Sequence, residues 1–325
     1  MPEQQRHAIV LMHAGAFQIA TDEEGIAQFR EHLSTRGIDA DVRMITEETT
    51  AKMLVTEAVD SHYDLIIAAG GDGTVQQVAA HMRDRTIPFG ILPLGTMNNI
   101  AFSLGLPMDL DSACDLIAYG TPKQIDMGVL NGVPYLEVAN IGAEAEMSPL
   151  IEALRHKGFL STLGATATFI KQIMRLHSHV LTIEVDGRRK HIHAWEVTVC
   201  NTPYYGLRYP AAHGARIDDG LLDVIIIRHR GILGYMGHYW AMLRNHDEPS
   251  RNVRSLRAQH VTITTKDPMP IAIGGYTEGM TPATVEVAAG ALKVYAPDDF
   301  ATTKPTGGPL TYILRSVAPI SSPSH

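Results

Sequence analysis

A glycine-rich turn follows directly on a strand of buried type near residue 70. Residues 64–70 read DLIIAAG, residues 70–74 read GGDGT, and helical periodicity follows at 75–82. A short, uniformly aliphatic run is typical of a strand in a parallel sheet that is covered on both faces. The junction therefore predicts a strand–turn–helix unit of an α/β domain.

Three more aliphatic runs alternate with helical segments over the first 120 residues. The strands are expected at 7–12, 39–45 and 87–92, and the helices at 21–37 and 53–59. Parallel neighbours need crossover connections of this kind, so the pattern predicts a doubly wound parallel sheet with helices on both faces. We assign residues 1–123 to this α/β nucleotide-binding domain.

After about residue 124 the pattern changes to short strands joined by tight turns. Two β-hairpins are expected around Asn131-Gly132 and Asp186-Gly187. Further strands are expected at 222–227, 261–265, 270–273, 283–287 and 291–296, and helices at 150–176 and 231–244. So many short strands favour a mainly antiparallel β-sandwich, assigned to residues 124–300 as the lipid or substrate domain. Residues 301–325, rich in Thr, Ser, Pro and Gly, are expected to be a partly disordered tail.

Composition narrows the class of protein further. Of the 325 residues 45% are hydrophobic, which is enough for two cores, and no apolar run approaches the length of a membrane-spanning helix. The net charge of −8 has the wrong sign for a nucleic-acid-binding protein. Two isolated cysteines, Cys114 and Cys200, suit buried thiols, and the first residues lack the zones of a signal peptide. We expect a cytoplasmic protein without a nucleic-acid partner.

The chemistry of the 70–74 turn points to a phosphate chain. Its glycines permit positive φ and let backbone N–H groups approach an anion at the start of a helix, whose dipole favours negative charge. The Asp72 carboxylate would repel bare phosphates, which suggests a magnesium ion or a hydrogen bond to a hydroxyl. The alternative is a glycine-rich turn with an Asp helix cap.

A second polar loop, residues 92–99 (LPLGTMNN), follows the next parallel strand and opens onto the same rim of the sheet. Thr96, Asn98 and Asn99 supply uncharged donors and acceptors that suit a nucleotide. The alternative is a Pro-Gly turn followed by an Asn-rich helix cap.

Together the two loops resemble the catalytic domain of diacylglycerol kinases, sphingosine kinases and related bacterial lipid kinases. The family signatures GGDGT and PxGTxNDxA are matched at residues 70–74 and 93–101, with Asn99 in place of the family Asp. Further landmarks are Asp126, Asn201 and the segment 215–224, ARIDDGLLDV, so the resemblance covers nearly the whole chain. GGDGT alone also occurs in NAD kinases and phosphofructokinases.

The resemblance implies an ATP- and Mg²⁺-dependent kinase of phospholipid metabolism that phosphorylates a lipid hydroxyl at a membrane surface. Asp218 and Asp219 are the implied metal residues, with an Asp-Asp-Gly turn as the alternative, and Asp72 is a catalytic candidate. Basic residues at 155–175 and at 228–257 suit an anionic lipid surface or are ordinary solvated side chains. A homodimer is one option for the oligomeric state. The implied nucleotide-binding residues are Gly70, Gly71, Gly73, Thr74, Gly95, Thr96 and Asn98.

Several family positions are altered in this chain. Competent relatives carry Asp-Gly-Glu in a late strand, and here Gly274 and Tyr276 stand where the acids should be. The nearest carboxylate, Glu278, is two residues further along, about 7 Å on a strand, and is the remaining candidate for the base. The family's early Asn-Pro-x-Ser-Gly turn is replaced by residues 12–16, MHAGA, and the usual Asn-Glu after GGDGT by Gln76-Gln77.

Three functions follow from these matches and departures. A lipid kinase is the first. An NAD kinase-like enzyme acting on a soluble nucleotide would use the same GGDGT turn, but the PxGTxN loop and the DDGLLDV segment favour the lipid branch. A catalytically weak nucleotide-binding sensor would explain the missing Asp-Gly-Glu, because a positioned base contributes about 10²- to 10⁴-fold to the rate.

Overall fold

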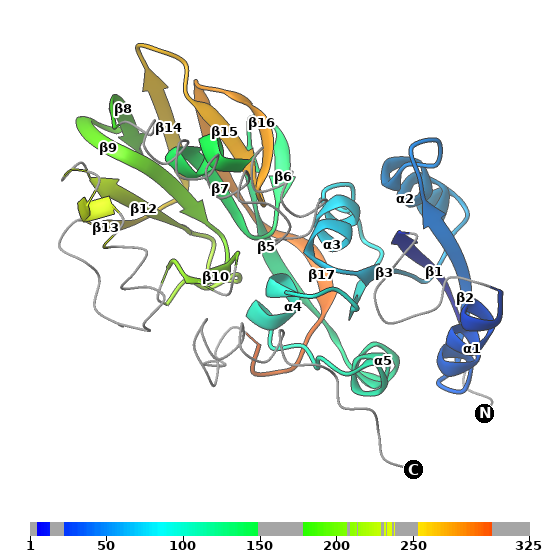
Figure 1. Cartoon of the computed structure of the whole chain (residues 1–325). Helices are drawn as coiled ribbons and strands as arrows, with labels where there is room; N and C mark the ends of the chain where they lie inside the picture. Colours follow the sequence, from blue (N-terminus) through cyan, green and yellow to red (C-terminus); the bar gives the residue numbers. More distant parts are fainter. Residues whose placement is uncertain are drawn as a thin grey trace.

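The chain folds into an α/β half and a β half that share one continuous ladder of strands (Figure 1). Strand β5 (Pro122–Leu130) and strand β17 (Ala283–Tyr295) connect the two halves. The structure, a computed structural model, describes residues 5–13, 23–148, 178–206, 209–212, 214–228, 231, 233–235, 237 and 253–300.

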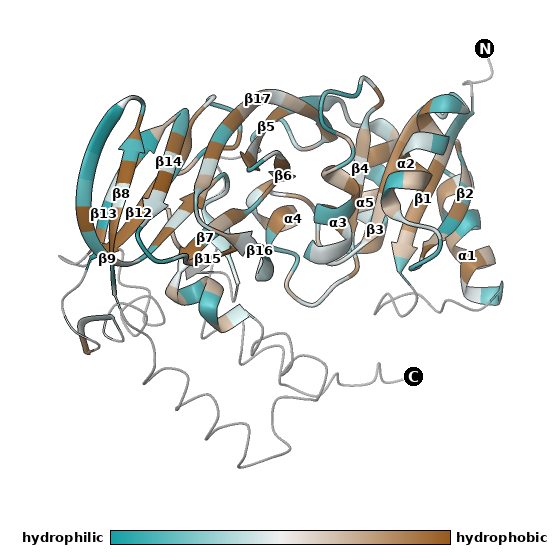
Figure 2. Cartoon of the chain, turned by 90° about the horizontal axis from the view of Figure 1, so that it is seen from above, coloured by the Kyte–Doolittle hydropathy of each residue, from teal (hydrophilic) through white to brown (hydrophobic). Residues whose placement is uncertain are grey.

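The α/β half is built on four parallel strands in the order β2, β1, β3, β4. Nearly every residue of β1, β3 and β4 is buried, as their aliphatic runs predict, and these strands are largely apolar in Figure 2. The strands span Arg6–His13 (β1), Ile38–Ile45 (β2), Leu65–Gly70 (β3) and Phe89–Pro93 (β4).

Helices cover both faces of this sheet. Ile9 and Leu11 of β1 belong to one core, whereas Ala8 and Val10 belong to the other, because successive side chains of a strand point to opposite faces. The prediction of a doubly wound sheet is therefore confirmed. Helices α2 (Ala51–Asp60), α3 (Asp72–Ala79) and α4 (Asn99–Ser103) pack on the first face, and α1 (Glu23–Ser34) and α5 (Leu110–Tyr119) on the second.

The β half is antiparallel, and its strands enclose one core of buried aliphatic residues, which confirms the sandwich prediction. Both expected hairpins form, and Asn131-Gly132 and Asp186-Gly187 adopt the positive φ that tight hairpin turns need. The remaining strands are β6 (Val133–Tyr135), β7 (Val138–Gly142), β8 (His179–Val185), β9 (Arg188–Cys200), β12 (Leu222–Arg228), β13 (Val253–Ala258), β14 (His260–Thr265), β15 (Pro270–Ile273) and β16 (Tyr276–Met280), with the short pair β10 (Tyr204–Tyr205) and β11 (Tyr209–Pro210) apart from them.

The structure corrects part of the predicted strand list. The separate strands expected at 283–287 and 291–296 are one strand, β17, which pairs with β5 and β14 and then places Val294 beside Phe89 of β4. Strand β13 is not predicted by the sequence, because its mostly exposed and polar residues lack the apolar alternation of a buried strand. The helix expected at 150–176 lies outside the described residues. Of 231–244, residues 231, 233–235 and 237 are described, and they are helical.

Candidate functional site

Two glycine loops, residues 70–74 and 93–99, lie in contact at the carboxyl ends of β3 and β4. A Cβ atom added to Gly95 would lie only 2.3 Å from the Cα of Gly71, so neither loop could keep this position with a larger residue facing the other. The expectation that the first loop uses positive φ is wrong, since none of its glycines is in the left-handed region and Gly71 has φ −88°. The glycines serve close backbone approach instead.

Asp72 is the first residue of α3 and connects the two loops. One of its carboxylate oxygens accepts a hydrogen bond of 2.9 Å from the backbone N–H of Ile100, at the start of α4. The carboxylate thus lies beside both glycine loops, where it caps α4. Its catalytic role and its magnesium contact stay predictions.

Asn98 shapes the second loop from within. It adopts a left-handed backbone conformation, with φ 51°, and its buried amide oxygen accepts a hydrogen bond of 3.0 Å from the Gly95 N–H. The amide nitrogen donates to the carbonyls of Pro93 and Gly95. The Asn98 side chain therefore holds the loop in shape, while Gly73 and Thr96 are the exposed members of the predicted nucleotide set.

The first turn of α3 offers donors to an anion. The N–H groups at the start of a helix have no acceptor within the helix, and its dipole adds partial positive charge. A Cβ on residue 70 would lie 2.5 Å from the Thr74 hydroxyl, so a residue larger than glycine does not fit there. Gly73 is exposed and has no side chain that would cover its backbone. These residues fit a phosphate chain.

A hairpin from the β half reaches the first glycine loop. Gly274 and Gly275 form the β15–β16 turn, with φ of 55° and 87°, and Ile273 pairs with Tyr276 beside it. A Cβ on Gly73 would lie 3.6 Å from the Tyr276 hydroxyl oxygen, so this tyrosine lies against the loop. The two positions at which this chain lacks the family acids, Gly274 and Tyr276, therefore lie at the candidate site.

Glu278 is the extra residue of a β-bulge on β16. Ile271 pairs with Gly279 and Ala272 pairs with Thr277, which leaves Glu278 without a cross-strand partner. Bulges re-aim side chains next to functional sites. Glu278 is exposed, and partial desolvation raises the pKa of its carboxyl above the ordinary value. Its role as a base stays a prediction.

The altered Gln76-Gln77 pair attaches α3 to its surroundings. The Gln76 amide donates to the carbonyl of Pro134 and accepts from the N–H of Leu136, each at 2.9 Å. Gln77 shares a hydrogen bond of 2.8 Å with His13 at the end of β1. Through Gln76, the helix of the first glycine loop is fixed to the segment that follows β6.

That segment carries a carboxylate that the sequence reading missed. Glu137 lies between β6 and β7, is 7% exposed, and places Oε2 3.9 Å from the point where a Cβ of Gly274 would be. The available signal was a single acidic residue inside the apolar run YLEVAN, residues 135–140.

The predicted metal residues both face arginines. Asp218 receives two hydrogen bonds of 3.0 Å from Arg216, and Asp219 pairs with Arg257 while accepting from the N–H of Leu221. This arrangement matches the Asp-Asp-Gly turn that was the alternative. Within the part of the chain that the structure describes, no three acidic, histidine or cysteine side chains gather in a way that could hold a metal ion. A magnesium role for the two residues stays a prediction.

Asp126, one of the positions that match the family, stabilises the turn that carries Asp218 and Asp219. Its two buried oxygens accept from the N–H groups of Gly220 and Gly290, at 2.7 and 2.8 Å. Asn201 donates to the carbonyls of Asp126 and Leu136. These four hydrogen bonds are scaffolding of the β half.

A pair of acids lies deeper in the β half. Glu144 accepts a hydrogen bond of 2.7 Å from the Tyr205 hydroxyl, and Glu196 accepts one of 2.8 Å from Tyr235. Desolvation, with the nearby Glu196 carboxylate, raises the pKa of Glu144 to about 8. Cys114 and Cys200 are buried free thiols, as expected.

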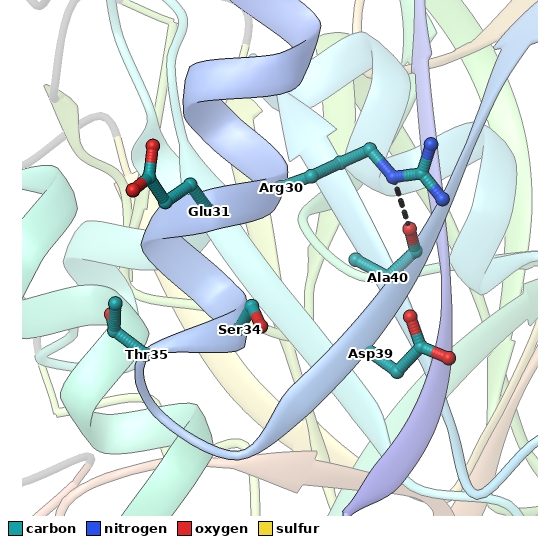
Figure 3. A pocket seen from close by; sticks show the side chains of 6 residues that line it. All are labelled: Arg30, Glu31, Ser34, Thr35, Asp39 and Ala40. Carbon is teal, nitrogen blue, oxygen red and sulfur yellow. Dashed lines mark hydrogen bonds between the residues drawn. The ribbon is translucent and has the colours of Figure 1, made fainter.

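A surface depression of about 540 Å³ lies elsewhere, between the end of α1 and the start of β2 (Figure 3). Arg30 crosses it and donates to the carbonyl of Ala40 at 2.8 Å. The glycine loops follow the carboxyl ends of β3 and β4, whereas Ala40 is at the amino end of the parallel strand β2, so the depression belongs to the opposite rim.

Fold and site together define a protein with an α/β half that carries two glycine loops in contact and a β half that reaches the first of them. Two family models match the chain in succession, the diacylglycerol kinase catalytic domain over residues 7–130 and the YegS C-terminal NAD kinase beta sandwich-like domain over residues 137–296. The chain belongs to this diacylglycerol kinase and YegS-like family of lipid kinases. The family resemblance and the two-part fold are thereby confirmed.

Curated relatives agree with this family. A diacylglycerol kinase of Bacillus subtilis is 26% identical over 262 residues, which are 79% of this chain and 86% of the relative. A YegS-like probable lipid kinase of Pseudomonas fluorescens is 28% identical over 228 residues, 69% of this chain and 73% of the relative. An uncharacterised Synechocystis protein is 30% identical over 240 residues, 71% of this chain, and the match spans 54% of that protein's length.

A crystal structure of a diacylglycerol kinase from Bacillus anthracis shares the fold. Its TM-score is 0.68 at 19% identity, over 90% of this chain and 97% of that one. Among the helices that the structure describes, none is long and apolar enough to cross a membrane.

Proposed function

We propose that this protein transfers the γ-phosphoryl group of ATP to a lipid hydroxyl, with Mg²⁺, at a membrane surface. The observation that carries the proposal is the contact of the two glycine loops beside the start of α3, with Tyr276 of the other half lying against Gly73. Membership in a lipid kinase family supports the lipid over a soluble nucleotide as the acceptor.

Different residues of the site bind the phosphates, hold the loops in position and hold the metal ion. The N–H groups of α3 bind phosphate oxygens, and Asn98 and the Gly71–Gly95 contact keep the loops close enough to do so. When bound with the nucleotide, Mg²⁺ neutralises charge on the phosphates, and Asp72 is the carboxylate beside the loops that would hold it. Positioning and charge neutralisation supply most of the catalysis in phosphoryl transfer.

Incubation with γ-labelled ATP, Mg²⁺ and mixed micelles that contain a panel of lipids tests this function. The expected product is a labelled phospholipid, and omission of Mg²⁺ should abolish it. A parallel incubation with NAD as acceptor distinguishes the NAD kinase-like alternative, because labelled NADP would then appear.

The nucleotide-binding sensor is retained as a second candidate because Gly274 and Tyr276 replace the family acids. Calorimetric titration with ATP separates it from a kinase. Binding of ATP without label in any acceptor would refute the kinase function and support the sensor.

A further inference from the structure

Transfer to an alcohol needs a group that takes the hydroxyl proton, and the base must be within hydrogen-bond reach of that proton. Three carboxylates of the described residues are candidates for this base. Asp72 already accepts the N–H of Ile100, and Glu278 lies exposed on a bulge. The third carboxylate, Glu137, is the buried one, beside the β15–β16 turn.

Two independent contacts fix Glu137 next to the site. Gln76, one turn along α3 from Gly73, bonds to Pro134 and Leu136, the residues just before Glu137. On its other side, the Glu137 carbonyl accepts the N–H of Asn201 at 2.9 Å. The backbone that carries this carboxylate is therefore tied both to the helix of the first glycine loop and to the β half.

The glycine at position 274 places no side chain beside the Glu137 carboxylate. Around the point where a Cβ of Gly274 would be, the only heavy atom within 4 Å among the described residues outside the turn itself is Oε2 of Glu137, at 3.9 Å. Tyr276, two residues further, lies against Gly73. The Glu137 carboxylate therefore borders the same hairpin whose Tyr276 lies against the first glycine loop.

We propose that Glu137 is the catalytic base of this kinase, an inference that rests on the proposed lipid kinase function. Glu137 takes the proton of the lipid hydroxyl, and the lipid oxygen bonds to the γ-phosphorus. The bond from that phosphorus to the β–γ bridging oxygen breaks, and its electron pair leaves with the nucleoside diphosphate. The Glu137 carboxylate comes from the segment just before β7. The Asp-Gly-Glu acids that the family resemblance implies would come from the β15–β16 turn.

The test compares Glu137→Gln with the wild type. Gln keeps the size of the side chain and its neutral hydrogen bonds, so the thermal midpoint and the calorimetric ATP affinity should stay near those of the wild type. Turnover should fall about 10²- to 10⁴-fold, and the dependence of the rate on the ionisation of a carboxyl should disappear from the pH profile. Glu286→Gln, an exposed carboxyl of β17, is the matched control and should retain full turnover.

A rescue variant separates chemistry from structure. Asp tolerates the positive φ of position 274 and precedes Gly275, a favoured pair for this turn, and its carboxylate would lie close to the point that Glu137 occupies. Gly274→Asp added to Glu137→Gln should therefore restore turnover at least 10-fold. If Glu137→Gln also lowers the thermal midpoint, the comparison is repeated with Glu137→Asp and with Gly274→Asp added to it. This second comparison still distinguishes a catalytic from a structural role of Glu137.

The outcomes are distinct. An active wild type with an equally active Glu137→Gln variant, or with activity lost only in Glu278→Gln, overturns the assignment of Glu137 and leaves the kinase function intact. Loss of activity in Glu137→Gln without rescue by Gly274→Asp also overturns it, in favour of a structural role. A wild type that labels no lipid overturns the kinase function and the base together.

Discussion

Gly95→Ala tests the contact between the two glycine loops. The new methyl group would lie 2.3 Å from the Gly71 Cα and 3.0 Å from the Gly71 nitrogen, both of which are backbone atoms that cannot rotate away. Ordinary carbon contacts need about 3.5 Å, so the loops must separate by about 1 Å. The methyl group would also meet the Asn98 oxygen at 2.8 Å, which is the oxygen that accepts the Gly95 N–H.

The cost follows from these two effects. Overpacking costs about 1–3 kcal/mol, and a disturbed internal hydrogen bond adds about 1 kcal/mol. We expect a loss of about 3 kcal/mol in the free energy of unfolding, which lowers the thermal midpoint by roughly 4–5 °C. ATP affinity should fall with it, because the loops no longer meet beside α3.

Gly73→Ala is the matched control for stability. Among the described residues its methyl group would meet only the Tyr276 hydroxyl, at an ordinary 3.6 Å, and replacing Gly by Ala in a helix gains up to about 1 kcal/mol. Thermal unfolding and calorimetry on both variants give the comparison. A Gly95→Ala protein with the unfolding free energy of the wild type would refute the loop contact and the reasoning built on it.

Three further predictions follow from the site and the buried acids. Asp72→Asn should weaken Mg²⁺-dependent ATP binding more than metal-free binding, measured by calorimetry, because Asn still accepts the Ile100 N–H but lacks the charge; an equal loss in both would leave Asp72 with a capping role only. The folded-state pKa of Glu144, about 8, exceeds its ordinary 4.5, so the folded state binds more protons at this group between these values; the contribution of Glu144 to the free energy of unfolding is therefore fully present below about pH 4.5 and is lost as pH rises through 8, and Glu144→Gln should flatten that decline in denaturant titrations. Asp219→Asn should lower the thermal midpoint without changing the Mg²⁺ dependence of turnover if the residue serves the turn, whereas a raised Mg²⁺ requirement would support the metal role.

Local patterns in the sequence were enough to predict the strands of the parallel sheet and both tight hairpins. Aliphatic runs and Asn-Gly or Asp-Gly turns are decided by neighbours in the chain. The sequence predicts two strands in place of β17 because residues 288–291, AAGA, resemble a break, and the partners β5 and β4 show that the strand continues.

The candidate site could be predicted only in part. The glycine loops carry motifs, so their place at one rim followed from the sequence. The approach of Glu137 to Gly274, and of Tyr276 to Gly73, joins residues that are far apart in the chain. Such contacts depend on how the β half docks on α3, which no local pattern contains.

Strand β17 has a consequence for how the chain matures. It is the last described strand, and it completes the ladders of β14 and β5 and reaches β4 at Val294. During synthesis, β14, β5 and β4 have unpaired edges until residues 283–295 have emerged, and unpaired strand edges can pair with other chains. Both halves therefore depend on this last described strand, and a chain interrupted before β17 would be prone to association rather than yield a smaller working unit.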